Sequence, residues 1–194
     1  MSGERQTLNV KIQAPFVMAE IRALRASIFK SSPEIQRALA IAEKVERTYD
    51  LTRADLFIPA QDTFYAIIEP FSQTLLTGPL RRVGAEMFPQ YSNILGIAKA
   101  NIRAALGFNT GADVIRFIAE SYSKVVIGPD AGNLIPEVSG STVTVTDDTF
   151  LPCQLQIGVF LGAGKHSGLF HDRPVVERSC RAKGDKLCVY QFNL

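Results

Sequence analysis

The chain has 194 residues, of which 46% are hydrophobic and 21% charged, a composition typical of folded rather than disordered proteins. Its 21 basic and 19 acidic side chains are interspersed and give a net charge of +2, which argues against a nucleic-acid-binding surface. No apolar run approaches the roughly 18 residues that a membrane-spanning helix needs, so no transmembrane segment is expected.

The N-terminal 15 residues carry charges without a following apolar run, so they do not have the pattern of a signal peptide. The cysteines, Cys153, Cys180 and Cys188, all lie in the C-terminal quarter of the chain. In a reducing compartment, clustered cysteines more often bind a metal than form disulfides. Because the sequence shows no export signal, we expect a cytoplasmic protein, in which these cysteines would be reduced.

The N-terminal half predicts helices. Apolar residues recur at helical spacing over residues 17–28, and Ser32, followed by a proline, marks the start of a second helix. Residues 92–106 predict a strong helix that ends at Gly107, and Thr110 or its predecessor can cap the next one. We expect residues 1–60 to form an N-terminal helical extension and residues 61–194 to form a ligand-binding domain.

The C-terminal part predicts strands. Val143 and Val145 alternate with threonines, the pattern of a half-buried strand. Residues 174–180 and 187–192 predict two strands joined by a glycine-containing turn. The apolar, glycine-rich segment 153–170 is compatible with a strand or a helix. The expected class is α+β, with N-terminal helices packed on an antiparallel sheet.

The cysteine spacing suggests a metal site. Cys180 and Cys188 lie at the inner ends of the two predicted tail strands, so a hairpin brings their sulfurs together. Glu177 faces the opposite side of a regular strand and reaches the same ion only across a β-bulge. Zinc accepts thiolate and carboxylate ligands in a tetrahedron. On spacing alone, free cysteines, with or without a disulfide between Cys180 and Cys188, are the more common explanation.

Residues 150–192 resemble the C-terminal half of the 4-vinyl reductase domain family. That family includes phenol-sensing input domains and proteins of bacteriochlorophyll synthesis, and it shares its fold with a subunit type of the TRAPP tethering complex. The resemblance implies a TRAPP-like ligand-binding fold with a C-terminal zinc-clamped hairpin. It also implies one structural zinc ion, held by Cys153, Glu177, Cys180 and Cys188.

The resemblance further implies an apolar pocket between the helices and the sheet. The candidate ligand-binding residues are Phe117, Tyr122, Phe150, Val159, Phe160 and Val175. The expected function is a zinc-stabilised carrier, sensor or assembly factor for an apolar small molecule, with a chlorophyll-type tetrapyrrole as the photosynthetic cargo. A homodimer is expected from the family and from the apolar helix face in residues 16–29.

Two alternatives stay open at this stage: a reductase of a tetrapyrrole vinyl group, and a structural interaction module without a ligand. The segment 158–164 lacks the spacing of a dinucleotide-binding loop, and we find no catalytic residues, so an enzyme is not the favoured prediction. His166 and His171 are expected to be ordinary surface-loop histidines.

Overall fold

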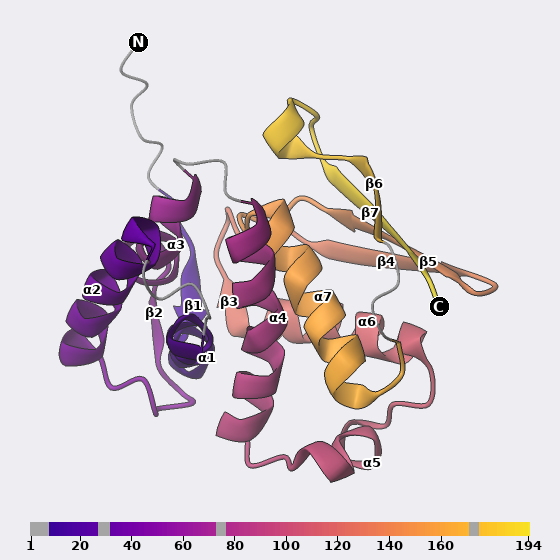
Figure 1. Ribbon diagram of the computed structural model, residues 1–194, viewed down its shortest axis with the longest axis horizontal. Coiled ribbons are helices and arrows are strands. Elements are labelled where there is room, and N and C mark those ends of the chain that lie inside the picture. The colour runs from indigo at the N-terminus through magenta and orange to yellow at the C-terminus, as the bar shows by residue number, and fades with distance from the viewer. Residues whose placement is uncertain (1–7, 27–31, 73–76, 171–174) are drawn as a thin grey trace.

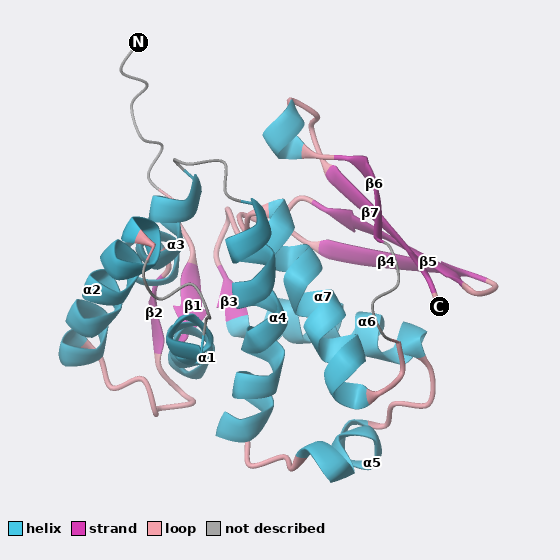
Figure 2. Cartoon of the chain, in the orientation of Figure 1, coloured by secondary structure: helices cyan, strands magenta, loops and turns pink. Residues whose placement is uncertain are grey.

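The structure, a computed structural model, describes residues 8–26, 32–72, 77–170 and 175–194. Two antiparallel sheets lie on either side of a central pair of helices, and further helices lie beside the smaller sheet (Figure 1, Figure 2). This arrangement confirms the predicted α+β class. Among the described residues, no helix combines the length and apolar character that crossing a bilayer requires.

The α-helices differ widely in length. They are α1 (Ala14–Ala26), α2 (Pro33–Thr48), α3 (Ala66–Ser72), α4 (Thr77–Ile94), α5 (Ile102–Leu106), α6 (Gly111–Val125) and α7 (Cys153–Ser167). Shorter helical turns cover Gln61–Tyr65, Lys99–Asn101 and Arg181–Lys183. In Figure 1, α4 and α7 lie between the two sheets.

The strands form one small and one larger sheet. The small sheet has the order β2-β1-β3 and consists of β1 (Lys11–Gln13), β2 (Phe57–Pro59) and β3 (Val126–Ile127). The larger sheet has the order β4-β5-β7-β6 and consists of β4 (Leu134–Ser139), β5 (Thr142–Asp147), β6 (Val175–Ser179) and β7 (Cys188–Asn193). All neighbouring strands are antiparallel.

Local sequence signals place several element ends as predicted. The Ser32 side chain accepts a hydrogen bond from the backbone N–H of Ile35 at 3.2 Å and caps α2. Thr110 and Asp113 form a reciprocal capping box at the start of α6. Gly184 turns the tail hairpin with a φ of 98°, a left-handed conformation that glycine adopts without strain.

The predicted helix over residues 92–106 is wrong. Helix α4 ends at Ile94, Gly96 takes a φ of 71°, and a new helix, α5, starts only at Ile102. The Ser92 hydroxyl donates a hydrogen bond to the carbonyl of Ile97 at 3.1 Å, which stabilises the turn. The apolar periodicity continues across this break, so periodicity alone did not detect it.

The glycine-rich segment left ambiguous by the sequence is helix α7, which packs along α4. A Cβ atom at Gly158 would collide with the carbonyl of Arg81, and one at Gly162 with the carbonyl of Ala85. The two backbones therefore approach more closely than any larger residue allows. This close pair of helices, α4 and α7, forms the central layer of the molecule (Figure 1).

Helix α1 packs against α4 and α2. The apolar face predicted for dimer contacts is buried inside the chain, because Val17, Ile21 and Leu24 have no exposed surface. Residues 27–29, the end of that predicted face, lie outside the described residues. The structure thus removes the surface argument for a homodimer.

Candidate ligand pocket and cysteine cluster

An apolar pocket lies between α1, α4, α6 and α7, and its cavity measures about 40 Å³. Its aromatic wall is formed by Phe16 of α1, Phe88 and Tyr91 of α4, and Phe117 and Tyr122 of α6. Two pairs of these rings pack edge to face. The centroids of Phe16 and Tyr91 are 5.7 Å apart, and those of Phe88 and Phe117 are 6.5 Å apart.

A few polar groups interrupt this wall. The Tyr122 hydroxyl donates a hydrogen bond to the carbonyl of Ala131, and burial raises the pKa of Tyr122. The Tyr91 hydroxyl lies 3.4 Å from Oε1 of Gln13. Gln156 of α7 and Ser121 of α6 also line the cavity, and no described residue forms a hydrogen bond with either side chain.

The predicted pocket residues divide into two groups. Phe117, Tyr122 and Val159 line the cavity. The other three lie away from it: Phe150 packs edge-on against Phe64, Phe160 packs edge-on against Phe192, and Val175 is half-buried on β6.

Sequence reasoning missed Phe16, Phe88 and Gln156 as pocket residues. Phe16 was assigned to a helix face expected at a dimer contact, and none of the predicted elements included Phe88. For Gln156 a signal was present, because it is one of two glutamines among the apolar residues of the segment 153–170, where packing can bury a polar group.

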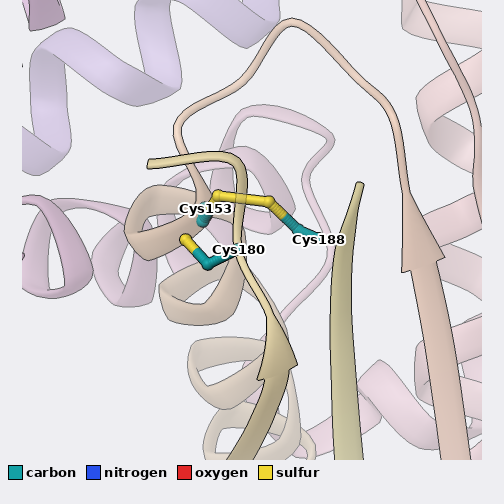
Figure 3. Close-up of side chains that lie close together, drawn as sticks. All are labelled: Cys153, Cys180 and Cys188. Atoms are coloured by element: carbon teal, nitrogen blue, oxygen red, sulfur yellow. A yellow bond between two sulfur atoms is a disulfide. The ribbon is translucent and has the colours of Figure 1, made fainter. Parts of the chain in front are cut away.

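The three cysteines lie close together at the N-terminal end of α7 (Figure 3). Cys153 is the first residue of α7, Cys180 follows β6, and Cys188 begins β7. Their sulfur atoms all lie within 4.8 Å of one another, and the three residues are 5%, 2% and 0% exposed. Cys153 and Cys188 form a disulfide, and Cys180 is a free, buried cysteine.

Glu177 does not join this cluster. A register irregularity does interrupt the β6–β7 ladder between Glu177 and Ser179, as a bulge would require. The Glu177 carboxylate is nonetheless paired with the ammonium group of Lys183 and accepts a hydrogen bond from Nε2 of Gln154 at 3.1 Å. The groups that do contact sulfur belong to Arg181, whose backbone N–H and Nε lie 3.4 and 3.5 Å from Sγ of Cys188.

His166 lies on α7 outside the pocket wall. Its Nε2 atom is 3.3 Å from the Ser92 hydroxyl, and its ring packs against Phe88 at 6.0 Å. Burial, and then the nearby charge of Lys99, lower its pKa. His166 is thus in α7 rather than in the predicted surface loop. His171 lies outside the described residues.

No family model and no curated protein sequence matches the chain. Solved structures are similar to it over nearly its whole length. An H-NOX protein from S. oneidensis in the Fe(II) state is 11% identical, with a TM-score of 0.55, covering 89% of this chain and 93% of that chain. An oxygen-binding H-NOX domain related to soluble guanylate cyclases is 12% identical, with a TM-score of 0.57, covering 93% and 92%.

This chain has the fold of H-NOX domains. A third similar structure, from work on haem distortion in the H-NOX family, is 13% identical, with a TM-score of 0.58, covering 93% of this chain and 92% of that one. Identities this low establish the fold alone, because one fold hosts many functions.

The identification with the 4-vinyl reductase family is wrong, because the similar solved structures are H-NOX domains and no family model matches. Four further predictions rested on that resemblance and are therefore wrong as well. They are the zinc cofactor, the zinc-stabilised carrier, the chlorophyll-type cargo and the link to photosynthesis. The physical reason is that the motif is short. A hairpin with a cysteine at each inner end brings two sulfurs together whatever they bind.

The pocket residues do not fit a haem group. Haem iron is held by histidine, cysteine, methionine or tyrosine. No histidine or cysteine lines the described pocket, and the Tyr122 hydroxyl is already bonded to Ala131. Met87 and Tyr91 remain, but a cavity of about 40 Å³ has no room for a macrocycle beside them. No lysine or arginine lies in the described wall to pair with the haem carboxylates.

Proposed function

We propose that this chain is a ligand-sensing domain whose ligand is a small, mainly apolar molecule bound directly by the pocket between α1, α4, α6 and α7. The observation that carries the proposal is the apolar, aromatic-lined cavity, because voids larger than a water molecule are few in a protein core. The fold supports a sensory role by analogy, since similar H-NOX structures are described in complexes with NO, CO or oxygen.

The cavity size sets the scale of the ligand. A water molecule needs roughly 10–15 Å³ on the same measure, so about 40 Å³ accommodates three or four non-hydrogen atoms. The most favourable small ligands gain roughly 1.5 kcal/mol per non-hydrogen atom. A diatomic gas bound only by these side chains therefore reaches about 3 kcal/mol, which is millimolar affinity, whereas a four-atom ligand reaches about 6 kcal/mol. The cavity therefore favours a ligand of about four non-hydrogen atoms over a diatomic gas.

The position of the cavity suggests how binding is transmitted. Phe16 and Phe88 form one side, from α1 and α4, and Phe117 forms another, from α6. Helix α6 continues directly into β3 and packs against β4. A ligand that separates these rings changes the packing of α6 on both sheets. Ligand binding thereby biases the arrangement of the sheets relative to the helices.

Xenon and cyclopropane test the pocket, because both depend on apolar burial alone. We expect saturable NMR shifts at amides of α6 and α7 near Phe117 and Val159. Val159→Phe fills the cavity and should abolish these shifts while the protein stays folded. A matched exposed change, Lys165→Met on the same helix, should leave them unchanged. If neither probe gives a saturable shift in the wild-type protein, the proposal is wrong.

We propose a metal-binding state for the cysteine cluster as a second, structural role. Three sulfurs within 4.8 Å match the reach of one soft metal ion once they are reduced, and no particular metal is assigned. Glu177, the fourth predicted ligand, would first have to leave Lys183 and Gln154. Elemental analysis of reduced wild-type protein and of Cys180→Ser tests this role. Equal metal content in the two proteins would count against it.

Three further proposals concern the domain organisation, the location and the assembly of the chain. Residues 1–60 would be an extension of a ligand-binding domain formed by residues 61–194, and Phe16 would make that extension part of the pocket wall. We also propose a cytoplasmic location, where the reduced, metal-binding state of the cysteine cluster would prevail over the disulfide. A homodimer is retained without an assigned surface, and sedimentation at about micromolar concentration would test it.

A further inference from the structure

We infer that Gln156 selects the ligand by a hydrogen bond from or to its side-chain amide. The pocket then binds a compact, neutral molecule of about four non-hydrogen atoms with one oxygen, such as a small ketone or alcohol. That oxygen forms the hydrogen bond with Gln156, and no haem takes part. This inference rests on the proposed function and names the ligand class of the same site.

Gln156 is a buried amide whose hydrogen-bonding groups are not used by the protein. It lies in the first turn of α7, is 2% exposed, and lines the cavity. No described residue donates to or accepts from its side chain. A residue this buried has little access to bulk water, yet its amide is not among the fully buried, unpartnered groups, which in the described residues are the Glu20 oxygens. The Gln156 amide therefore opens onto the cavity, where a ligand can supply the hydrogen bond that the protein does not.

Gln154, two residues earlier on the same helix, shows the contrast. Its Oε1 accepts a hydrogen bond from Nε of Arg81 at 3.0 Å, and its Nε2 donates to Glu177 at 3.1 Å. Both ends of that amide are therefore satisfied by the protein. The two glutamines differ in that Gln156 faces the cavity, so the unpaired amide belongs to the pocket.

The wall around Gln156 restricts the chemistry of its partner. No charged residue lines the described cavity, so an ionic ligand would be buried without a counter-charge, which is strongly unfavourable. Buried water typically needs about three hydrogen bonds, and most of the wall, including the rings of Phe16, Phe88 and Phe117, offers none. Besides Gln156, the polar groups in the wall are the hydroxyls of Ser121 and of the two tyrosines. An apolar body with a single oxygen satisfies both conditions, since the carbon atoms contact the rings and the oxygen meets the amide.

Acetone and isobutene provide a sharp test, because they share one shape and differ in oxygen versus methylene. Binding of each is measured by NMR titration to wild-type protein and to Gln156→Met, which replaces the amide with an apolar side chain of similar length. The ratio of acetone to isobutene affinity should fall about tenfold in Gln156→Met, the usual effect of one hydrogen bond. Gln154→Met is the matched control and should leave the ratio unchanged.

Gln156→Leu serves as the second apolar variant should Gln156→Met fail to fold, and the same tenfold fall is expected. An unchanged ratio in a folded Gln156 variant overturns the inference and leaves the proposed function standing, because both molecules still bind. Failure of acetone, isobutene and xenon to bind wild-type protein overturns the proposed function itself. Stoichiometric haem uptake, with a shifted Soret band, would overturn the haem-free part of the inference.

Discussion

Tyr190 of β7 donates its hydroxyl hydrogen bond to Oδ2 of Asp147 on β5 at 2.7 Å, with both side chains completely buried. Burial raises the pKa of Asp147, while the bonds from Tyr190 and Thr149 and the charge of Arg181 oppose that rise. Arg181 lies 3.6 Å from Asp147 and also contacts Cys188. This network therefore joins the larger sheet to the cysteine cluster.

Tyr190→Phe should destabilise the protein by about 1–3 kcal/mol, because it leaves the buried Asp147 carboxylate one donor short. Urea denaturation monitored by circular dichroism measures the free energy of unfolding. Tyr65→Phe, at a half-buried tyrosine outside this network, is the control and should cost less. Equal losses in both variants would show that the hydrogen bond to Asp147 contributes nothing specific.

Glu20 predicts an unusual pH dependence of stability. It is completely buried on α1, neither carboxylate oxygen has a described hydrogen-bond partner, and burial raises its pKa well above the usual value. Because the folded state then binds a proton more tightly than the unfolded state, the contribution of Glu20 to stability is greatest below about pH 4, the unfolded pKa. It falls as the pH rises from there through the raised folded pKa.

Glu20→Gln removes this titration while keeping the shape of the side chain. The free energy of unfolding should therefore decline less steeply with pH in Glu20→Gln than in the wild type, measured between about pH 4 and pH 8. Comparing the two proteins cancels the contribution of Asp147, whose pKa is raised in the same direction. Parallel pH profiles would mean that Glu20 is not buried as a neutral acid.

Gly162→Ala should be destabilising although alanine favours helices by about 1 kcal/mol. Its Cβ would collide with the carbonyl of Ala85 and force α7 away from α4, with an expected net loss of about 1–3 kcal/mol. Gly78→Ala in the first turn of α4 is the matched control, since open space surrounds that position. The melting temperature of Gly162→Ala should be well below those of Gly78→Ala and the wild type.

The cysteine pairing predicts a definite count of reactive thiols. Denatured, unreduced protein should react with one equivalent of a thiol reagent, at Cys180, and reduced protein should react with three. In the folded state, Cys180 should react slowly because it is 2% exposed. Three reactive thiols before reduction would exclude the disulfide and favour the reduced, metal-binding state.

The sequence determined those features that depend on residues within a few positions of one another. The cap at Ser32, the capping box at Thr110 and the hairpin turn at Gly184 each follow from local backbone geometry and side-chain reach. The alternation around Val143 and Val145 likewise predicted a strand that buries one face. The α+β class followed from these elements in their order along the chain.

Only the tertiary structure decided which side chains meet. Phe16 and Phe117 are far apart in sequence and share one cavity, whereas the neighbours Val159 and Phe160 point to different surroundings. The direction of each depends on how α7 lies against α4, and that depends on backbone contacts at Gly158 and Gly162. Periodicity reports that a helix has an apolar face, but the partner of that face is set by packing between distant segments.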